Sequence, residues 1–397
     1  MKVFILTGEP FPHGMAATNR ITKYAQGLIA NGIDCEVIIT ARTEPYHKVR
    51  NNKNCGISHD QIKFTYIPDT TTRSRKFFTR RVYDLYDYLR VSYWIKQNIH
   101  CGDVVLFYNL QLLGMRRIIK TCHNNGIKIV RELCELPYGT QSDSAKNKLL
   151  RSLYEKFVMP HFDGFIAISQ ALEQYAHSIC SGKTPIIKIP ILIDVNQYND
   201  INPYIHNNPY IFHAGTMYER KDAIVSTIKA FAIASKKIGN SLDFILAGPE
   251  SPHKSELEQI ISDNDLYNNI HFIGSLTHNE VLSYQKGAWL TILNKHDNPQ
   301  NRNGFSTKLG DVLLAGTPVI TTTVGEANNF LRDGESALIT QPGDTEAIAE
   351  LIVRAYNNPK LLASISMTGK QIAKECFDSH RQGGILTRFL INEIIQC

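Results

Sequence analysis

NRNGFSTKLGDVLLAGTPVIT, residues 301–321, combines a glycine-containing loop, a helix and a β-strand. Ser306 and Thr307 are favourable N-cap residues, so the pattern predicts a helix that opens at one of them and leads into the apolar strand PVIT. The N-terminus of such a helix presents unpaired N–H groups and a positive dipole, Lys308 adds a full charge, and Asp311 follows about one turn later. This arrangement favours a bound phosphate group, and an ordinary capped helix with a solvated lysine is the alternative.

A second stretch, YIFHAGTMYERKD at residues 210–222, has the same logic. An apolar strand ends in a small turn at Gly215, and Arg220 and Lys221 then stand at the start of a helix that we expect to run through Ala230. Two loops that follow strands therefore offer cations and backbone amides.

These residues together resemble the retaining glycosyltransferases of family 4, the glycosyl transferases group 1, which have the GT-B fold. In that family a glycine and an Arg-Lys pair grip the donor diphosphate, and a Ser-Lys-Leu helix start precedes an acid and then Ala-x-Gly-x-Pro-Val-Ile. The matching residues here are Gly215, Arg220, Lys221, Lys308, Leu309, Ala315, Gly316, Pro318, Val319 and Ile320. Residues 324–344, with Glu326, also look like the family's following stretch, so the resemblance covers nearly the whole chain.

The resemblance implies an α/β protein with the GT-B fold, in which two doubly wound Rossmann-like domains face a central cleft. Residues 1–200 would form an N-terminal acceptor-binding domain, and residues 201–377 a nucleotide-sugar-binding domain. Residues 378–397 would form a C-terminal helix that crosses back onto the first domain.

The resemblance also implies roles for individual residues. Arg220, Lys221 and Lys308 would be the catalytic cations that stabilise the leaving diphosphate. Asp311 would bind the ribose, and Ile273 lies in a stretch that resembles the one whose backbone holds the nucleotide base. The full set of implied donor-binding residues is Gly14, Gly215, Asn303, Gly304, Phe305, Ser306, Thr307, Leu309, Asp311 and Ile273.

Asn303 and Asp311 depart from the family pattern, which has glutamate at both places. Asp311 keeps the charge, and its shorter carboxylate can still accept hydrogen bonds from two hydroxyl groups. Asn303 would face the sugar and carries no charge. Either the hexose is held through amide contacts here, or the donor differs from the commonest ones.

The first half of the chain opens as a βαβ unit, with strands KVFILT and CEVIIT around a helix from about Thr18 to Asn31. The three-glycine dinucleotide fingerprint is absent, so a Rossmann cofactor site is disfavoured. Further apolar runs predict a doubly wound parallel sheet whose ligands gather at the carboxyl ends of the strands. The residues that follow those ends are the acceptor-site candidates His13, Asn109, Glu132 and Glu135, with ordinary surface acids and a loop histidine as the alternative.

The chain has 397 residues, of which 43% are apolar and 20% charged, and this length suits two globular domains. It has no uninterrupted apolar run of spanning length, so we expect neither an export signal nor a transmembrane segment. Its eight cysteines lack paired spacing, which disfavours disulfides and a zinc site and favours a reducing cytosol. We expect no metal and no cofactor, since the cations above can neutralise the donor diphosphate.

The positive charge lies in the first half of the chain. Residues 1–195 hold 26 Lys and Arg against 16 Asp and Glu, whereas residues 196–397 hold 17 against 21. Around Phe77 and Phe78 the cations are Arg73, Arg75, Lys76, Arg80 and Arg81. Cations among aromatics suit an anionic membrane surface, and a helix with a solvated basic face is the alternative. Nucleic acid is disfavoured because no binding motif for it is present.

The sequence therefore predicts a hexosyltransferase that moves a sugar from a nucleotide diphosphate sugar, with a UDP-sugar favoured, to a saccharide or lipid-linked acceptor. Retention of configuration is implied by the resemblance alone. We expect a cytoplasmic protein, peripheral at the inner membrane face, that works in surface polysaccharide or glycan biosynthesis. A GT-B nucleotide-sugar epimerase and a catalytically degenerate nucleotide-sugar-binding subunit are the alternatives.

Overall fold

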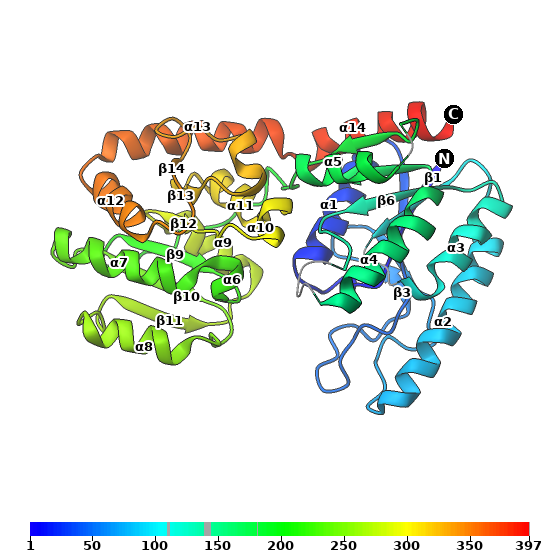
Figure 1. The fold of residues 1–397 in the computed structure, drawn as a ribbon, viewed down its shortest axis with the longest axis horizontal. Coiled ribbons are helices and arrows are strands. Elements are labelled where there is room, and N and C mark those ends of the chain that lie inside the picture. Colours follow the sequence, from blue (N-terminus) through cyan, green and yellow to red (C-terminus); the bar gives the residue numbers. More distant parts are fainter. Residues whose placement is uncertain (109–111, 139–143, 181, 397) are drawn as a thin grey trace. The chain divides into compact units, whose positions relative to one another are not determined.

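The computed structural model describes residues 1–108, 112–138, 144–180 and 182–396. The chain divides into two compact units (Figure 1). Unit 1 comprises Met1–Leu192 and Ser379–Cys397, and unit 2 comprises Ile193–Asp378. Each unit is a mainly parallel β-sheet with helices between consecutive strands, so the predicted α/β class is confirmed.

The sheet of unit 1 has the strand order β3-β4-β2-β1-β5-β6-β7-β8, and only the pair β3–β4 is antiparallel. The central strand β1 is buried along almost its whole length, which explains why the run KVFILT is nearly continuous in apolar residues. The strands are β1 (Lys2–Thr7), β2 (Asp34–Ile39), β3 (Cys55–Ile57), β4 (Lys63–Tyr66), β5 (Val104–Tyr108), β6 (Lys128–Leu133), β7 (Gly164–Ala167) and β8 (Ile186–Lys188).

Helices connect these strands, and the end of the chain returns to the same unit. The helices of unit 1 are α1 (Ala16–Ala30), α2 (Phe77–Asn98), α3 (Leu112–Asn124), α4 (Ala145–Phe157), η1 (Met159–His161), α5 (Gln170–Ile179), α14 (Ser379–Phe389) and the π-helical η3 (Leu390–Ile395).

Helix α1 begins two residues before the predicted start at Thr18. The hydroxyl of Thr18 does not cap the helix but donates to the carbonyl of Pro10 at 2.7 Å, and Met15 occupies the N-cap without a side-chain hydrogen bond. Thr18 therefore fastens the preceding loop to the helix instead of starting it.

The sheet of unit 2 consists of two three-stranded sheets, β11-β10-β9 and β12-β13-β14, joined by a bridge between Ile211 and Leu290. The combined order β11-β10-β9-β12-β13-β14 has the first strand at its centre, as in a doubly wound Rossmann-like sheet. The strands are β9 (Tyr210–Ala214), β10 (Asp243–Ala247), β11 (Ile270–Gly274), β12 (Thr291–Leu293), β13 (Val319–Thr322) and β14 (Leu338–Thr340).

The predicted helix after β9 is divided into two parts. Ala223 adopts a left-handed conformation, with φ of 44°, between the short helix α6 and the longer helix α7. The helices of unit 2 are α6 (Glu219–Asp222), α7 (Ile224–Ile238), α8 (Lys254–Asp263), α9 (His278–Gly287), α10 (Pro299–Asn303), α11 (Thr307–Ala315), η2 (Gly325–Asn329), α12 (Thr345–Tyr356) and α13 (Pro359–Cys376).

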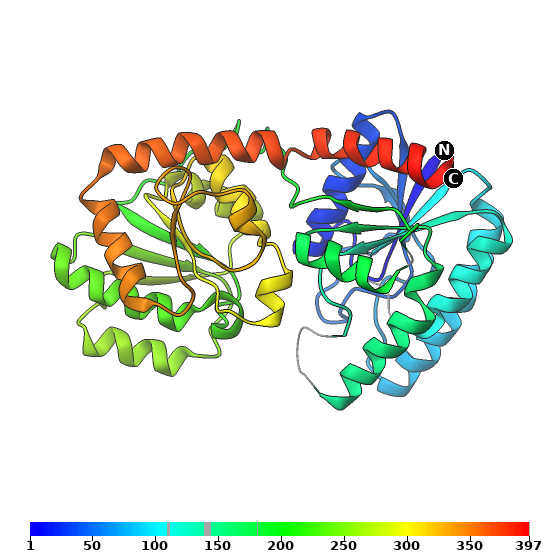
Figure 2. The same cartoon turned by 45° about the horizontal axis from the view of Figure 1, so that its top comes forward.

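Helices α1 and α14 of unit 1 cross at glycines (Figure 2). A Cβ atom on Gly383 would lie 2.3 Å from the carbonyl carbon and oxygen of Gly27, and one on Gly27 would lie 2.3 Å from the carbonyl oxygen of Ser379. The amide of Asn31 donates to Gly27 and His380 carbonyls at 2.8 Å each and holds the two helices together. The close approach of the two backbones depends on the missing side chains.

We expect Gly383→Ala to destabilise unit 1 by about 1–3 kcal/mol, because the added methyl group meets backbone that must move. The measurement is the free energy of unfolding from urea titration. Gly182→Ala is the control with the same chemical change in unit 1, since a Cβ atom there would meet no other atom of the described residues within 4 Å. Equal stability of the wild type and Gly383→Ala would show that the crossing tolerates a Cβ atom.

Candidate functional site

Lys308 lies in the first turn of α11, against the loop that follows β9. A Cβ atom on Gly215 would lie only 2.3 Å from the ammonium nitrogen of Lys308, so glycine is needed there for the lysine to reach its position. The nitrogen is buried although the side chain as a whole is 30% exposed. Ser306 occupies the N-cap of α11, and its side chain makes no capping hydrogen bond, which leaves the first N–H groups of the helix to other acceptors.

A buried carboxylate, Asp222, lies beneath this lysine. Its Oδ1 atom is 2.7 Å from the ammonium nitrogen of Lys295 and 3.3 Å from that of Lys308. Burial opposes the ionisation of Asp222, but the two lysines outweigh it and hold its pKa well below the usual range. The cluster therefore contains two cations and one anion, and it is electropositive.

The neighbouring groups follow from this charge. Burial, only partly offset by Asp222, lowers the pKa of Lys308 to about 8. Burial and then Lys308 lower the pKa of His213 to about 3, so this imidazole is neutral at pH 7. No hydrogen-bond partner for His213 Nε2 lies among the described residues. The site thus has a positive charge beside a weakly basic histidine.

Arg220 and Lys221 lie on α6, whose backbone is anchored from several sides. The carbonyl of Lys221 accepts from Lys295 at 2.8 Å, and that of Arg220 accepts from Asn298 at 2.9 Å. Both cationic side chains are exposed. Their backbone is fixed while their charged ends reach solvent beside the Lys308 cluster.

Glu219, which the sequence did not single out, explains why α7 starts where it does. Its carboxylate accepts from the N–H of Val225 at 2.6 Å and from the hydroxyl of Ser226 at 2.7 Å, so it caps α7 from outside the helix. His296 contacts the same carboxylate at 2.6 Å. Hydrogen bonds of this kind are visible only in the folded chain, because the partners are up to 77 residues apart.

The segment expected to face the sugar contains the short helix α10 instead of an open loop. The amide of Asn303 donates to the carbonyl of Pro299 at 2.8 Å, and Gly304 ends the helix. The ring of Phe305 is buried and stacks on Phe330 with centroids 5.4 Å apart, so only its backbone remains for a donor. A Cβ atom on Gly325 would meet the carbonyls of Asn301 and Gly304, which packs this segment against the loop after β13.

Asp311 is held in place by Gln197, a residue that no sequence pattern singles out. Gln197 donates from Nε2 to Oδ1 of Asp311 at 2.8 Å, and the hydroxyl of Tyr198 donates to the backbone carbonyl of Asp311 at 3.1 Å. Leu309, on the opposite side of the helix, is buried in the core. Asp311 lies one turn beyond the N-terminus of α11, where a side-chain oxygen can reach a ligand bound at that end.

Ile273 lies near the end of β11 in unit 2 and packs partly buried against an apolar cluster that includes Phe212 and Ile245. Gly274, directly after it, accepts from the N–H of Gly248 at 2.8 Å and has a left-handed φ of 74°. Strands β9, β10 and β11 thus end together near Gly215, and a Cβ atom on Gly248 would lie 1.9 Å from the carbonyl oxygen of Gly215.

In unit 1 the acceptor-site candidates are not equivalent. Glu132 is 1% exposed, and its carboxylate accepts from Arg20 and from the hydroxyl of Tyr24, both at 2.8 Å. Arg20 also donates to the carbonyls of Ile189 and Pro190. With both oxygens of its carboxylate used in this way, Glu132 fastens α1 to β6 and to the segment after β8.

The other candidates of unit 1 are near the surface. His13 and Glu135 are exposed. Gly14 allows the loop to turn onto α1, because a Cβ atom there would lie 1.8 Å from the hydroxyl oxygen of Thr18. Asn109 lies outside the described residues.

One group of side chains in the described part of the chain has metal-ligand spacing. His206, Asp243 and His271 have ligand atoms within 4.8 Å of one another. Asp243 starts β10 and pairs with Tyr210 at the beginning of β9, so the group lies at the amino end of the sheet, opposite to Gly215. The expectation that the donor site needs no metal stays a prediction.

The geometry defines a protein of two Rossmann-like units with a cationic site at the carboxyl ends of the strands of unit 2. Residues 196–372, which lie in unit 2, match the family described as Glycosyl transferases group 1. A 2-deoxystreptamine N-acetyl-D-glucosaminyltransferase of Niallia circulans is 29% identical over 131 residues, which are 33% of this chain and 32% of that protein. The capsular polysaccharide biosynthesis glycosyltransferase CapM of Staphylococcus aureus is 33% identical over 81 residues, which are 20% of this chain and 21% of that protein.

The chain thus spans about a third or less of the length of these two relatives. Among solved structures, Anabaena HepE in complex with UDP superimposes with a TM-score of 0.72 at 16% identity, over 98% of this chain and 100% of that one. The predicted GT-B fold is confirmed. No helix in the described part of the chain has both the length and the apolar character that crossing a membrane requires.

We expect Asp222→Asn to lower the free energy of unfolding by about 3 kcal/mol, since it leaves the ammonium groups of Lys308 and Lys295 without their buried counter-charge. This loss of stability is at the lower end for a buried ion pair, because the asparagine oxygen can still accept a hydrogen bond from Lys295. Chemical denaturation measures it, with Asp200→Asn on the surface as the control. A loss no larger than that of the control would mean that the lysines do not need this carboxylate.

Proposed function

We propose that the chain is a retaining glycosyltransferase of the hexosyltransferase type. It transfers a sugar from a nucleotide diphosphate sugar, with UDP as the favoured nucleotide, to a saccharide or lipid-linked acceptor. The observation that carries the proposal is the ammonium group of Lys308, held between Gly215 and Asp222 at the N-terminus of α11. The domain match and the UDP in the HepE structure support this choice of donor.

In the reaction the bond between the anomeric carbon and the diphosphate oxygen breaks, and negative charge grows on the diphosphate. Lys308 and the first N–H groups of α11 would stabilise this charge from one side. Arg220 and Lys221, which lie on α6, would stabilise it from another. Preorganised groups of this kind can each supply roughly 10²- to 10³-fold in rate. They need little rearrangement, because Asp222, Lys295 and Asn298 already fix their supporting backbone and side chains.

The acceptor hydroxyl attacks the anomeric carbon, and its proton must leave. His213 is a poor general base because its pKa is lowered to about 3 by burial and by Lys308. The departing diphosphate is a better proton acceptor, and in that case the hydroxyl attacks from the same face of the sugar as the leaving group. This supports retention of the anomeric configuration.

In this proposal unit 2, with Asp311 and Gln197 near the ribose and Asn303 near the sugar, binds the donor. Gly304, Ser306, Thr307 and the residues near Ile273 contribute backbone groups to the same donor. Unit 1 binds the acceptor, with His13 and Glu135 as the remaining exposed candidates. The match to CapM favours a role in surface polysaccharide or glycan biosynthesis.

We expect Lys308→Ala and Lys221→Ala each to lower turnover by at least about 10²-fold, because each removes one charge from the diphosphate site. The test uses a panel of nucleotide sugars and acceptors and measures released nucleoside diphosphate. Lys254→Ala is the matched control, as it removes an exposed lysine of α8 in the same unit. Near-normal turnover in either site variant would contradict the assignment.

The same assay separates the alternatives. Nucleotide release without glycosyl transfer to any acceptor would point to an epimerase that proceeds through free nucleotide. Nucleotide binding without any turnover would point to a degenerate binding subunit.

The pH dependence of nucleotide binding provides a second readout of Lys308. A bound diphosphate favours the charged lysine, whose pKa in the unliganded site is about 8. Affinity for UDP should therefore be full at about pH 7 and fall as the pH rises through about 8 to 9. Isothermal titration calorimetry of Lys308→Ala should show a flatter dependence of UDP affinity on pH. The ionisation of UDP itself affects both proteins equally and cancels in the comparison. Parallel profiles would mean that Lys308 does not meet the diphosphate.

We further propose that unit 1 docks on an anionic membrane at the cytoplasmic face through the first turns of α2. Phe78, Val82 and Leu85 on this helix are 82%, 66% and 63% exposed, and Arg75 and Lys76 precede it. Each cation near an anionic leaflet contributes about 1 kcal/mol, and inserted apolar side chains add to it. Such docking is reversible and weakens with salt.

Vesicle sedimentation tests this docking. The triple variant Arg75→Gln, Lys76→Gln, Phe78→Ser should bind phosphatidylglycerol vesicles at least about tenfold more weakly than the wild type, as two cations and one ring are lost. Lys96→Gln, Lys120→Gln is the charge-matched control from other parts of unit 1. Equal sedimentation with anionic and neutral vesicles, at low and high salt, would leave a soluble acceptor as the better interpretation.

A further inference from the structure

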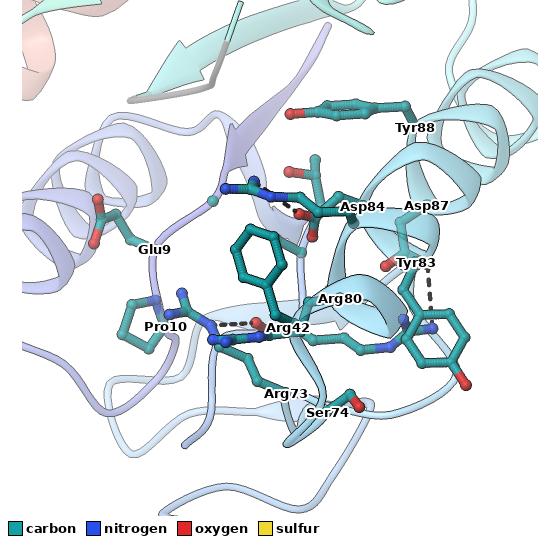
Figure 3. Close-up of a pocket in the computed structure, with 15 residues that line it drawn as sticks. Glu9, Pro10, Arg42, Arg73, Ser74, Arg80, Tyr83, Asp84, Asp87 and Tyr88 are labelled. Carbon is teal, nitrogen blue, oxygen red and sulfur yellow. Dashed lines mark hydrogen bonds and ion pairs between the residues drawn. The ribbon is translucent and has the colours of Figure 1, made fainter. Parts of the chain in front are cut away.

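Unit 1 contains a pocket of about 420 Å³ that none of the site residues above lines (Figure 3). Its floor is formed where two parallel strands end, by Gly8, Glu9 and Pro10 after β1 and by Thr40, Ala41 and Arg42 after β2. Its other wall is the start of α2. Figure 3 shows Arg42 and Arg73 between Pro10 and that helix. The carboxyl ends of strands in open α/β sheets are where ligands bind, so the place itself favours a ligand.

Arg42 is a buried cation in the lining of the pocket. It is 9% exposed, and its guanidinium group lies 3.9 Å from the centre of the Tyr83 ring. Nη2 is 3.3 Å from the carboxylate of Asp87, but Nε and Nη1 are buried and have no hydrogen-bond partner. A buried N–H group without an acceptor is costly, and two on one charged group indicate that a further acceptor completes this site.

Arg73 and Arg80 are the two open cations of the pocket. Arg73 uses Nε to donate to the backbone carbonyl of Arg42 at 2.8 Å, and Arg80 lies over the ring of Phe77 at 5.9 Å. Neither has a carboxylate of the described residues within ion-pair distance, unlike Arg81, which lies 3.5 Å from Asp84. Their charges are therefore available to a ligand.

The carboxylates of the pocket do not cancel this charge. Asp84 is paired with Arg81, and Asp87 with Arg42. Burial, only partly offset by Arg42, raises the pKa of Asp87 to about 6. Glu9, the third acid, lies on the strand side in Figure 3, away from α2. The lining thus combines paired ions with two open guanidinium groups and with the rings of Phe77 and Tyr88, which suits an anionic group attached to a sugar ring.

We propose that this pocket binds a phosphate group carried by the acceptor, held by Arg42, Arg73 and Arg80. This inference rests on the proposed transferase function, and it narrows the acceptor to a phosphorylated sugar. The forked guanidinium groups fit phosphate oxygens in a bidentate manner. The phosphate can belong to a soluble sugar phosphate or to a lipid-linked one, and the chemistry in the pocket is the same for both.

Isothermal titration of the whole protein with glucose 1-phosphate, inorganic phosphate and glucose tests the pocket, with UDP present to fill the donor site. We expect the two phosphates to bind and glucose to bind much more weakly. The double variant Arg73→Gln, Arg80→Gln should weaken phosphate binding by roughly tenfold or more, as two charge-assisted hydrogen bonds are lost. Arg75→Gln, which neighbours the pocket but does not line it, should bind within about twofold of the wild type.

A second pair of variants separates this inference from the proposed function. Lys308→Ala leaves the pocket intact, so it should keep the affinity for glucose 1-phosphate even if it loses all turnover. Loss of phosphate binding in Lys308→Ala, with the double variant unaffected, would place the phosphate at the donor site and overturn the inference. Phosphate binding that depends on Arg73 and Arg80 in a protein with no transferase activity would overturn the proposed function alone.

Vesicles distinguish the two sources of the phosphate. If the acceptor is lipid-linked, vesicles that contain phosphatidic acid should compete with glucose 1-phosphate, and this competition should depend on Arg73 and Arg80. If the acceptor is a soluble sugar phosphate, such vesicles should not compete. Phosphate binding that is equal in the wild type and the double variant would overturn the inference for either source.

Discussion

The contact between Lys308 and Asp222 is the constraint on which the cationic site of unit 2 depends. A buried carboxylate is stable only if it is paired, and Asp222 is paired with Lys308 from α11 and with Lys295 from the segment after β12. One segment that follows β9 and two that follow β12 are thereby fastened to one point. Because two cations surround one anion, the pairing leaves an excess of positive charge, and Gly215 keeps the space in which Lys308 can present it.

Most strands could be predicted because strands that are buried on both faces need apolar residues throughout, and helices between them need an apolar stripe. The expectations for β1, β2 and β13 are confirmed to within one or two residues. The sequence could not predict the break at Ala223 or the start of α1. Both are set by side chains acting at a distance: Glu219 caps α7 from outside the helix, and Thr18 donates to Pro10 instead of capping α1.

The candidate site divides in the same way. Lys308, Arg220 and Lys221 could be chosen as candidates because helix starts and paired cations are local patterns. Asp222, Lys295 and Gln197 could not, since their partners lie 73 to 114 residues away. Glu132 shows that a local pattern does not reveal pairing. An acid at the end of a strand looks like a ligand-binding residue, yet the pairing of Glu132 with Arg20, 112 residues distant, gives it a structural role inside unit 1. Local charge predicts where ions lie, and only the fold decides which of them are already neutralised.

The positive charge in the first half of the chain is also divided by the fold, between a pocket and an exposed surface. Arg73, Arg80 and Arg81 line a pocket, so of the five cations around Phe77 only Arg75 and Lys76 remain outside it. Two cations contribute about 2 kcal/mol at an anionic leaflet, which is too little for stable attachment without help. Burial of apolar surface at about 25 cal/mol per Å² makes Phe78, Val82 and Leu85 the larger contributors. Membrane contact through α2 and phosphate binding in the pocket can then coexist, because they use different residues of the same basic segment.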